Sequence, residues 1–104
     1  MARRIFTVST PLGERVFLTR DRWRQIIRYK HPAVASKQNE VRACLEWPEV
    51  IRESAKERDV HLYYKKSGEQ YVCVVTAPAD DDERFVVTAY LARNVKKGIE
   101  LWTS

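Results

Sequence analysis

The sequence predicts an α+β fold in which two N-terminal helices pack on an antiparallel sheet of about four strands, preceded by a β-hairpin. Three observations support this prediction. Two short apolar runs, residues 5–8 and 16–19, flank a turn at 9–14 that contains Pro and Gly. Two segments with helical spacing of apolar residues follow, and the rest of the chain reads as short strands. No linker or repeat divides residues 1–104, so a single domain is expected.

Composition narrows the class of protein. Nineteen Lys and Arg against fourteen Asp and Glu give a net charge of +5, which favours an anionic partner such as nucleic acid, although many small domains are mildly basic. No apolar run approaches the roughly 18 residues of a membrane span, and no signal-peptide hydrophobic region follows Met1. We therefore expect a cytoplasmic protein without a membrane partner. Cys44 and Cys73 lack metal-ligand spacing and are expected to be buried thiols.

Two helices are predicted after the hairpin. Thr19 or Asp21 can cap the first helix, which should end at His31 because the proline that follows disfavours helical geometry in the residue before it. The second helix opens at Ser36 and ends at the Trp-Pro pair that begins with Trp47. These two segments supply the helical layer of the predicted fold.

The second half of the chain is predicted to form an antiparallel meander of four strands, at residues 50–54, 60–65, 71–77 and 84–91. The third strand is apolar on both faces and is therefore placed centrally in the sheet. Residues 99–102 alternate and can add a short terminal strand. The acidic connection at 79–83 is expected to be a solvated loop and not a metal site.

The last long strand has two chemically different faces, because successive side chains of a strand point to opposite sides. One face is apolar and is predicted to belong to the core: Phe85, Val87, Ala89 and Leu91. The opposite face carries Val86, Thr88 and Tyr90, and Arg93 follows. A hydroxyl, a phenol and a guanidinium can hydrogen-bond, stack on a base and hold a phosphate, so this face is a plausible wall of a binding site.

Assigning the side chains of the other strands to two faces in the same way adds further polar residues to this face. If the helices cover one side of the sheet, the uncovered side is predicted to gather Arg52, Ser54, His61, Tyr63, Thr88 and Tyr90. One interpretation is an ordinary solvated sheet face. The other is a site for RNA cleavage without a metal ion, which needs a base for the 2′-hydroxyl, an acid for the leaving oxygen and cations for the phosphorane.

His31 stands apart from this strand set, at the predicted end of the first helix. A cationic side chain is favoured at the negative end of a helix, where it can simply cap backbone carbonyls. The alternative is a catalytic imidazole. Trp23, Trp47 and Trp102 are interpreted as core anchors and not as platforms for bases.

With these residues in hand, the chain resembles the barnase, EndoU, colicin and RelE-like RNase superfamily, in particular its phage-associated nuclease-like branch. The resemblance spans Val16 to Trp102 and rests on the order of the strings "YKHP", "WPEVIRES", "VHLYYKK", "FVVTAYLAR", "KKG" and "LW". It implies a metal-independent ribonuclease or toxin without a cofactor. The site residues that it implies are His31, Arg52, Tyr63, Thr88, Tyr90 and Arg93. Catalytic residues differ between branches, since EndoU-like enzymes use two histidines and a lysine whereas RelE-like toxins can work without histidine.

The function expected from these observations is an endoribonuclease that cleaves RNA by attack of the 2′-hydroxyl on the adjacent phosphate. His31 would be the general acid or base, and Arg52 and Arg93 would stabilise the phosphorane. Tyr63 or Tyr90 would stack a base or donate a proton. Thr88 would position a phosphate oxygen. The alternative is an inactive module that binds RNA or protein. A third expectation is a protein partner, such as an inhibitor or antitoxin, within a toxin–antitoxin or phage system.

Overall fold

The structure, a computed structural model, describes residues 3–80 and 82–104. Asp81, in the predicted acidic loop, lies outside the described residues, as do Met1 and Ala2. The chain runs through β1 (Arg4–Ser9), β2 (Arg15–Thr19), α1 (Arg20–Gln25), a π-helical segment η1 (Ile26–Lys30), a 3-10 turn η2 (Pro32–Val34), α2 (Gln38–Glu46), β3 (Val50–Ser54), β4 (His61–Ser67), β5 (Gln70–Pro78), β6 (Glu83–Ala92) and β7 (Gly98–Thr103).

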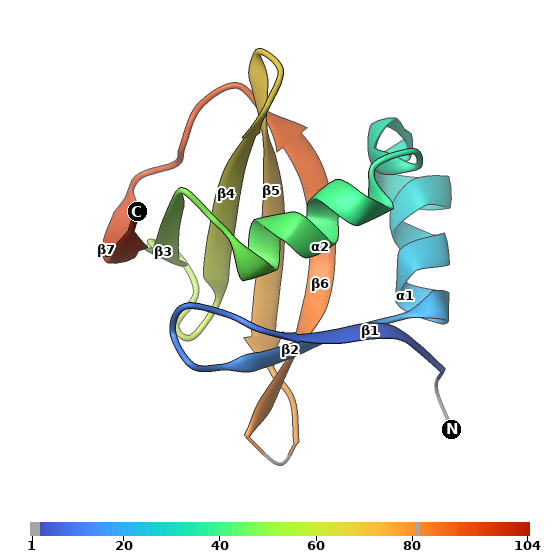
Figure 1. The fold of residues 1–104 in the computed structure, drawn as a ribbon, viewed down its shortest axis with the longest axis horizontal. Coiled ribbons are helices and arrows are strands. Elements are labelled where there is room, and N and C mark those ends of the chain that lie inside the picture. The colour runs from blue at the N-terminus through green and yellow to red at the C-terminus, as the bar shows by residue number, and fades with distance from the viewer. Residues whose placement is uncertain (1–2, 81) are drawn as a thin grey trace.

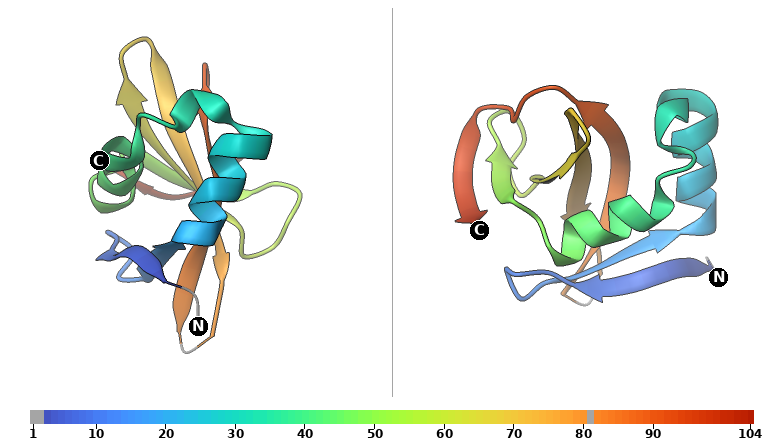
Figure 2. Two further views of the ribbon diagram at one scale, coloured as in Figure 1. Left: turned by 90° about the vertical axis from the view of Figure 1, so that its right-hand side faces the viewer. Right: turned by 45° about the horizontal axis from the view of Figure 1, so that its top comes forward.

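All seven strands form one mixed sheet in the order β1-β2-β6-β5-β4-β3-β7. Every neighbouring pair is antiparallel except β2 and β6, which pair in parallel through residues 15–17 and 83–85. The sheet curls strongly, so that the β1–β2 hairpin and β7 lie on either side of α2 (Figures 1 and 2). Helix α2 therefore fills the hollow of the sheet.

The predicted fold class is wrong in its sheet and in its helical layer. The expected sheet had about four antiparallel strands, whereas the structure is 48% strand and only 23% helical. The N-terminal hairpin joins the sheet because β2 pairs with the beginning of β6, and the tail joins it because β7 pairs with β3. The strand positions followed from local patterns, but a strand's partner depends on contacts that no local pattern specifies.

The helices are shorter and less regular than predicted. Thr19 caps α1 by accepting a hydrogen bond from the Arg22 amide at 3.1 Å, but the chain then widens into η1, where the His31 amide donates to the Ile26 carbonyl at 2.6 Å. Helix α2 begins at Gln38, two residues after the predicted start at Ser36. No helix within residues 3–80 and 82–104 is long and apolar enough to cross a lipid bilayer.

Apolar side chains are buried on both faces of the sheet. On the inner face, Val41, Cys44 and Leu45 of α2 pack in the main core cluster together with sheet residues that include Val72 and Val74. On the outer face, a second cluster is formed by Leu62, Tyr64 and Cys73, against which Val50, Tyr71, Val75, Tyr90, Ala92 and Val95 pack. The central strand β5 contributes to both clusters, as its two apolar faces predicted.

A β-bulge changes the predicted faces of β6. The register of β5 and β6 shifts between Val75 and Thr76, so Val75 pairs with Thr88 while Thr76 pairs with Val86. The extra residue, Val87, breaks the alternation. As a result Val86 is buried with Ala89 in the main core, and Val87 shares the outer side with Thr88 and Tyr90. The sequence predicted Val87 on the core face and Val86 on the opposite face, and both of these assignments are therefore wrong.

Candidate functional site

A groove of about 520 Å³ lies on the outer face of the sheet, opposite α2. Its floor comes from β4, β5 and β6, and its two walls come from the β3–β4 connection and from the segment between β6 and β7. Three lysines bring positive charge to it: Lys56 on one wall, and Lys96 and Lys97 on the other. The remaining polar groups are the hydroxyls of Ser54, Thr88 and Tyr90 and the carboxylate of Glu57.

Tyr90 connects this groove to His31. The two rings lie with their centroids 5.3 Å apart, and the Lys96 ammonium lies 5.5 Å from the centre of the Tyr90 ring. His31 can reach this position because β2 pairs with β6 only as far as Phe85, and the segment from α1 to η2 packs along the part of β6 that follows. The imidazole, the phenol and the ammonium are therefore brought together from three separate parts of the chain.

The two hydroxyls on β6 differ in their chemistry. The Thr88 Oγ1 atom is buried and has no hydrogen-bond partner within the described part of the chain. A buried hydroxyl without a partner costs free energy, which a ligand oxygen or a water molecule could recover. Burial, with the Cys73 thiol as the next contribution, raises the pKa of Tyr90, so its phenol stays neutral.

Arg52 holds one wall of the groove in place. Its side chain projects from β3 on the same sheet face, and its Nη1 donates to the Lys96 carbonyl at 3.0 Å. The Lys96 amide in turn donates to the Tyr64 hydroxyl at 3.1 Å. These two hydrogen bonds fix the backbone that carries Lys96, so Arg52 is placed to position a cation and not to bind phosphate directly.

Two of the sequence-predicted site residues lie away from the groove. Tyr63 is fully buried in the main core, where its hydroxyl donates to Thr10 Oγ1 at 3.0 Å and burial raises its pKa to about 12. The prediction had placed Tyr63 on an uncovered face, but Tyr63 pairs with Ile51 and Val74 on the face that α2 covers. Arg93 is exposed beyond the end of β6, beside Glu69 and Gln70.

Sequence reasoning missed a buried polar cluster on the inner side of the sheet. The His61 Nδ1 atom lies 3.2 Å from Glu14 Oε1, and the Arg84 Nε atom lies 3.6 Å from the same oxygen. Arg84 also donates to Thr76 Oγ1 at 3.1 Å. His61 and Arg84 are only 8% and 6% exposed, so the cluster is part of the interior. Strand alternation had placed His61 on the uncovered side of the sheet, and nothing local to Arg84 signals its burial.

The groove also contains groups that the strand patterns did not indicate. Lys56 and Glu57 belong to the β3–β4 connection, and a polar connection of this kind carries no local signal of a site. Ser54, Thr88 and Tyr90 line the groove together, and His31 contacts it through Tyr90. Within residues 3–80 and 82–104, no group of three His, Cys, Asp or Glu side chains is arranged to hold a metal ion.

Comparison with known proteins adds no relative: no protein family, curated protein or solved structure matches this chain.

Proposed function

We propose that the outer groove binds RNA and that the protein is a metal-independent endoribonuclease with His31 as its proton-transfer group. The observation that carries this proposal is that His31 and Lys96 both lie against the ring of Tyr90. Tyr90 lines a groove that contains three lysines. An imidazole serves well in proton transfer at neutral pH, and ammonium groups stabilise a phosphorane. Of these groups, the sequence resemblance implies His31 and Tyr90 but not Lys96.

The proposed reaction assigns one step to each group. His31 accepts the proton of a ribose 2′-hydroxyl, whose oxygen attacks the adjacent phosphorus. The bond from phosphorus to the 5′-oxygen breaks, and the leaving oxygen takes a proton from the Lys96 ammonium. The products are a 2′,3′-cyclic phosphate and a 5′-hydroxyl. Thr88 offers its unpartnered hydroxyl to a phosphate oxygen, and the neutral Tyr90 phenol donates a further hydrogen bond.

Incubation with a defined RNA in the presence of a chelator tests this proposal. We expect products with cyclic phosphate ends, and we expect no cleavage of the same RNA when the nucleotide at the cleavage site lacks its 2′-hydroxyl. His31→Ala should lower the rate by about 10²- to 10⁴-fold. Strict dependence on a metal ion, or cleavage of the deoxy substrate, would contradict the proposed chemistry.

Two matched variants separate the groove from its surroundings. Lys96→Ala should impair cleavage, whereas Arg93→Ala removes a cation from the same connecting segment but outside the groove and should leave the rate unchanged. Tyr63→Phe should also cleave normally, because its hydroxyl contacts only Thr10 in the core. Equal losses for Lys96→Ala and Arg93→Ala would place the reaction elsewhere.

A second candidate function is RNA binding without cleavage. It is favoured by the position of Arg52, whose guanidinium is engaged with the Lys96 carbonyl, and by the absence of Arg93 from the groove, since both were expected to contact phosphate. Salt-dependent RNA binding by the parent protein, with no change in the length of the RNA, would support this candidate over the nuclease.

A further inference from the structure

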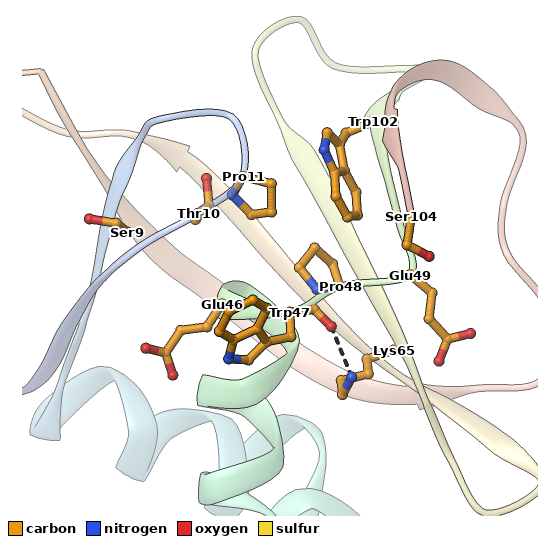
Figure 3. A pocket seen from close by; sticks show the side chains of 10 residues that line it. All are labelled: Ser9, Thr10, Pro11, Glu46, Trp47, Pro48, Glu49, Lys65, Trp102 and Ser104. Carbon is orange, nitrogen blue, oxygen red and sulfur yellow. Dashed lines mark hydrogen bonds between the residues drawn. The ribbon is translucent and has the colours of Figure 1, made fainter.

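A second pocket, of about 570 Å³, lies at the end of α2 and not on the groove side of the sheet (Figure 3). Four parts of the chain form it: the turn after β1, the residues that follow α2, the end of β7, and Lys65 of β4. These parts meet here because the sheet curls around α2 and brings the hairpin and β7 to either side of it. The pocket therefore opens at the gap between the two sides of the curled sheet.

Four rigid apolar side chains dominate the pocket: Pro11, Trp47, Pro48 and Trp102. Trp102 packs partly against the main core, but Trp47 is 72% exposed and contributes little to the core. This corrects the prediction that all three tryptophans are core anchors. An exposed indole offers a large apolar face that a ligand can cover.

The pocket also contains charged side chains. Two glutamates, Glu46 and Glu49, and Lys65 line the pocket (Figure 3). The Lys65 ammonium donates to the Trp47 carbonyl at 2.9 Å, and Glu46 is paired with Arg42 Nε at 3.5 Å. Glu49 accepts a hydrogen bond from the Lys66 amide at 2.7 Å but forms no ion pair within the described residues. The pocket thus combines two indoles with one carboxylate, Glu49, that has no ion pair among the described residues, in a chain whose net charge is +5.

We propose that this pocket binds an arginine or lysine side chain of a basic segment in a partner protein. The face of an indole attracts a cation, and the apolar stem of Arg or Lys can pack on the prolines. The carboxylate of Glu49 complements the same charge and opposes the phosphate groups of RNA. The binding of this partner does not depend on the activity of the outer groove, which lies on the other face of the sheet.

Titration with short peptides tests the proposal by the indole NH signals in NMR spectra. The probes are three nine-residue Gly-Ser peptides that differ only in three positions, occupied by Arg, Pro or Glu. We expect the Arg peptide to shift the signals of Trp47 and Trp102 while the signal of Trp23, which is buried at 8% exposure, stays in place. Equal binding of the Pro peptide would show a neutral proline-recognition site and overturn the proposal, as would stronger binding of the Glu peptide.

Variants make the test specific to the pocket. Trp47→Ala and Glu49→Gln should each weaken binding of the Arg peptide, the first by about fivefold or more. Tyr29→Ala is the matched control, since it removes another aromatic ring that is 75% exposed but lies outside the pocket. Retention of Arg-peptide affinity in Trp47→Ala, or an equal loss in Tyr29→Ala, would overturn the assignment.

Discussion

The cluster of Glu14, His61 and Arg84 shows how a single interior site links stability to pH. Burial lowers the pKa of His61 below its ordinary value, and the positive charge of Arg84 acts in the same direction. The carboxylates of Glu14 and Glu53 oppose this shift but do not cancel it. His61 is therefore held neutral in the folded protein at pH values where the unfolded chain already binds a proton.

This arrangement predicts that the free energy of unfolding falls as the pH is lowered from 7 to 5. Because the folded-state pKa of His61 lies below the unfolded value of about 6.5, the unfolded state binds more protons in this range. The stabilisation is complete above the unfolded pKa and is lost as the pH falls toward the folded value. Urea unfolding at a series of pH values should show a shallower decrease for His61→Gln than for the parent protein. An identical pH profile for both proteins would exclude His61 as the source.

Single residues also show where sequence patterns stop being informative. The outward direction of Thr88 and Tyr90 relative to Ala89 follows from strand alternation alone. The position of Val87 does not, because a bulge inserts one residue and reverses the alternation on its N-terminal side. Tyr63 was misplaced for a different reason: alternation separates the two faces of a strand, but it does not reveal which of the two faces the helix covers.

At the scale of elements, β7 holds the groove wall in place. It is an edge strand whose pairing with β3 anchors the lysine-containing segment before it. Gly98 begins this strand opposite Ser54, and a Cβ atom there would collide with the Glu53 carbonyl oxygen. Only glycine allows the two backbones to approach this closely. The sequence predicted strands at 50–54 and 99–102, but not that they pair with each other, because their separation along the chain leaves no local signal.

Gly98→Ala is therefore expected to destabilise the protein by about 1–3 kcal/mol, the usual cost of forcing an added carbon into a packed site. RNA binding in the groove should weaken with it, because Lys96 and Lys97 immediately precede the displaced residue. Urea unfolding and an RNA titration at the same temperature measure the two effects. Ile99→Ala, a change at a 65% exposed position in the same strand, should alter neither. Normal stability of Gly98→Ala would show that the strand can shift to accept a side chain.

At the scale of the whole molecule, exposed arginines follow the helical segment that leads to His31. Arg20, Arg24 and Arg28 are exposed at intervals of one helical turn along α1 and η1, and this segment ends at His31. Arg24 has an ion pair with Asp21 at 3.7 Å, but both partners are largely exposed, so this pair competes weakly with a phosphate. The Trp47 pocket contains none of these arginines, so the arginine-bearing segment and the proposed cation-binding pocket are separate.

This distribution predicts that long RNA gains affinity from the helix as well as from the groove. Replacing Arg20, Arg24 and Arg28 together by Gln should weaken binding of a 15-nucleotide RNA and reduce the slope of log affinity against log salt by about 2, since each lost phosphate contact contributes about 0.7. A dinucleotide, which can occupy only the groove, should bind the triple variant and the parent protein equally. Both titrations can be followed by fluorescence anisotropy of labelled RNA. An unchanged salt slope for the 15-nucleotide RNA would show that the three arginines do not contact the RNA, without contradicting binding in the groove. Equal losses of affinity for both RNAs would mean that the arginines act through the groove itself.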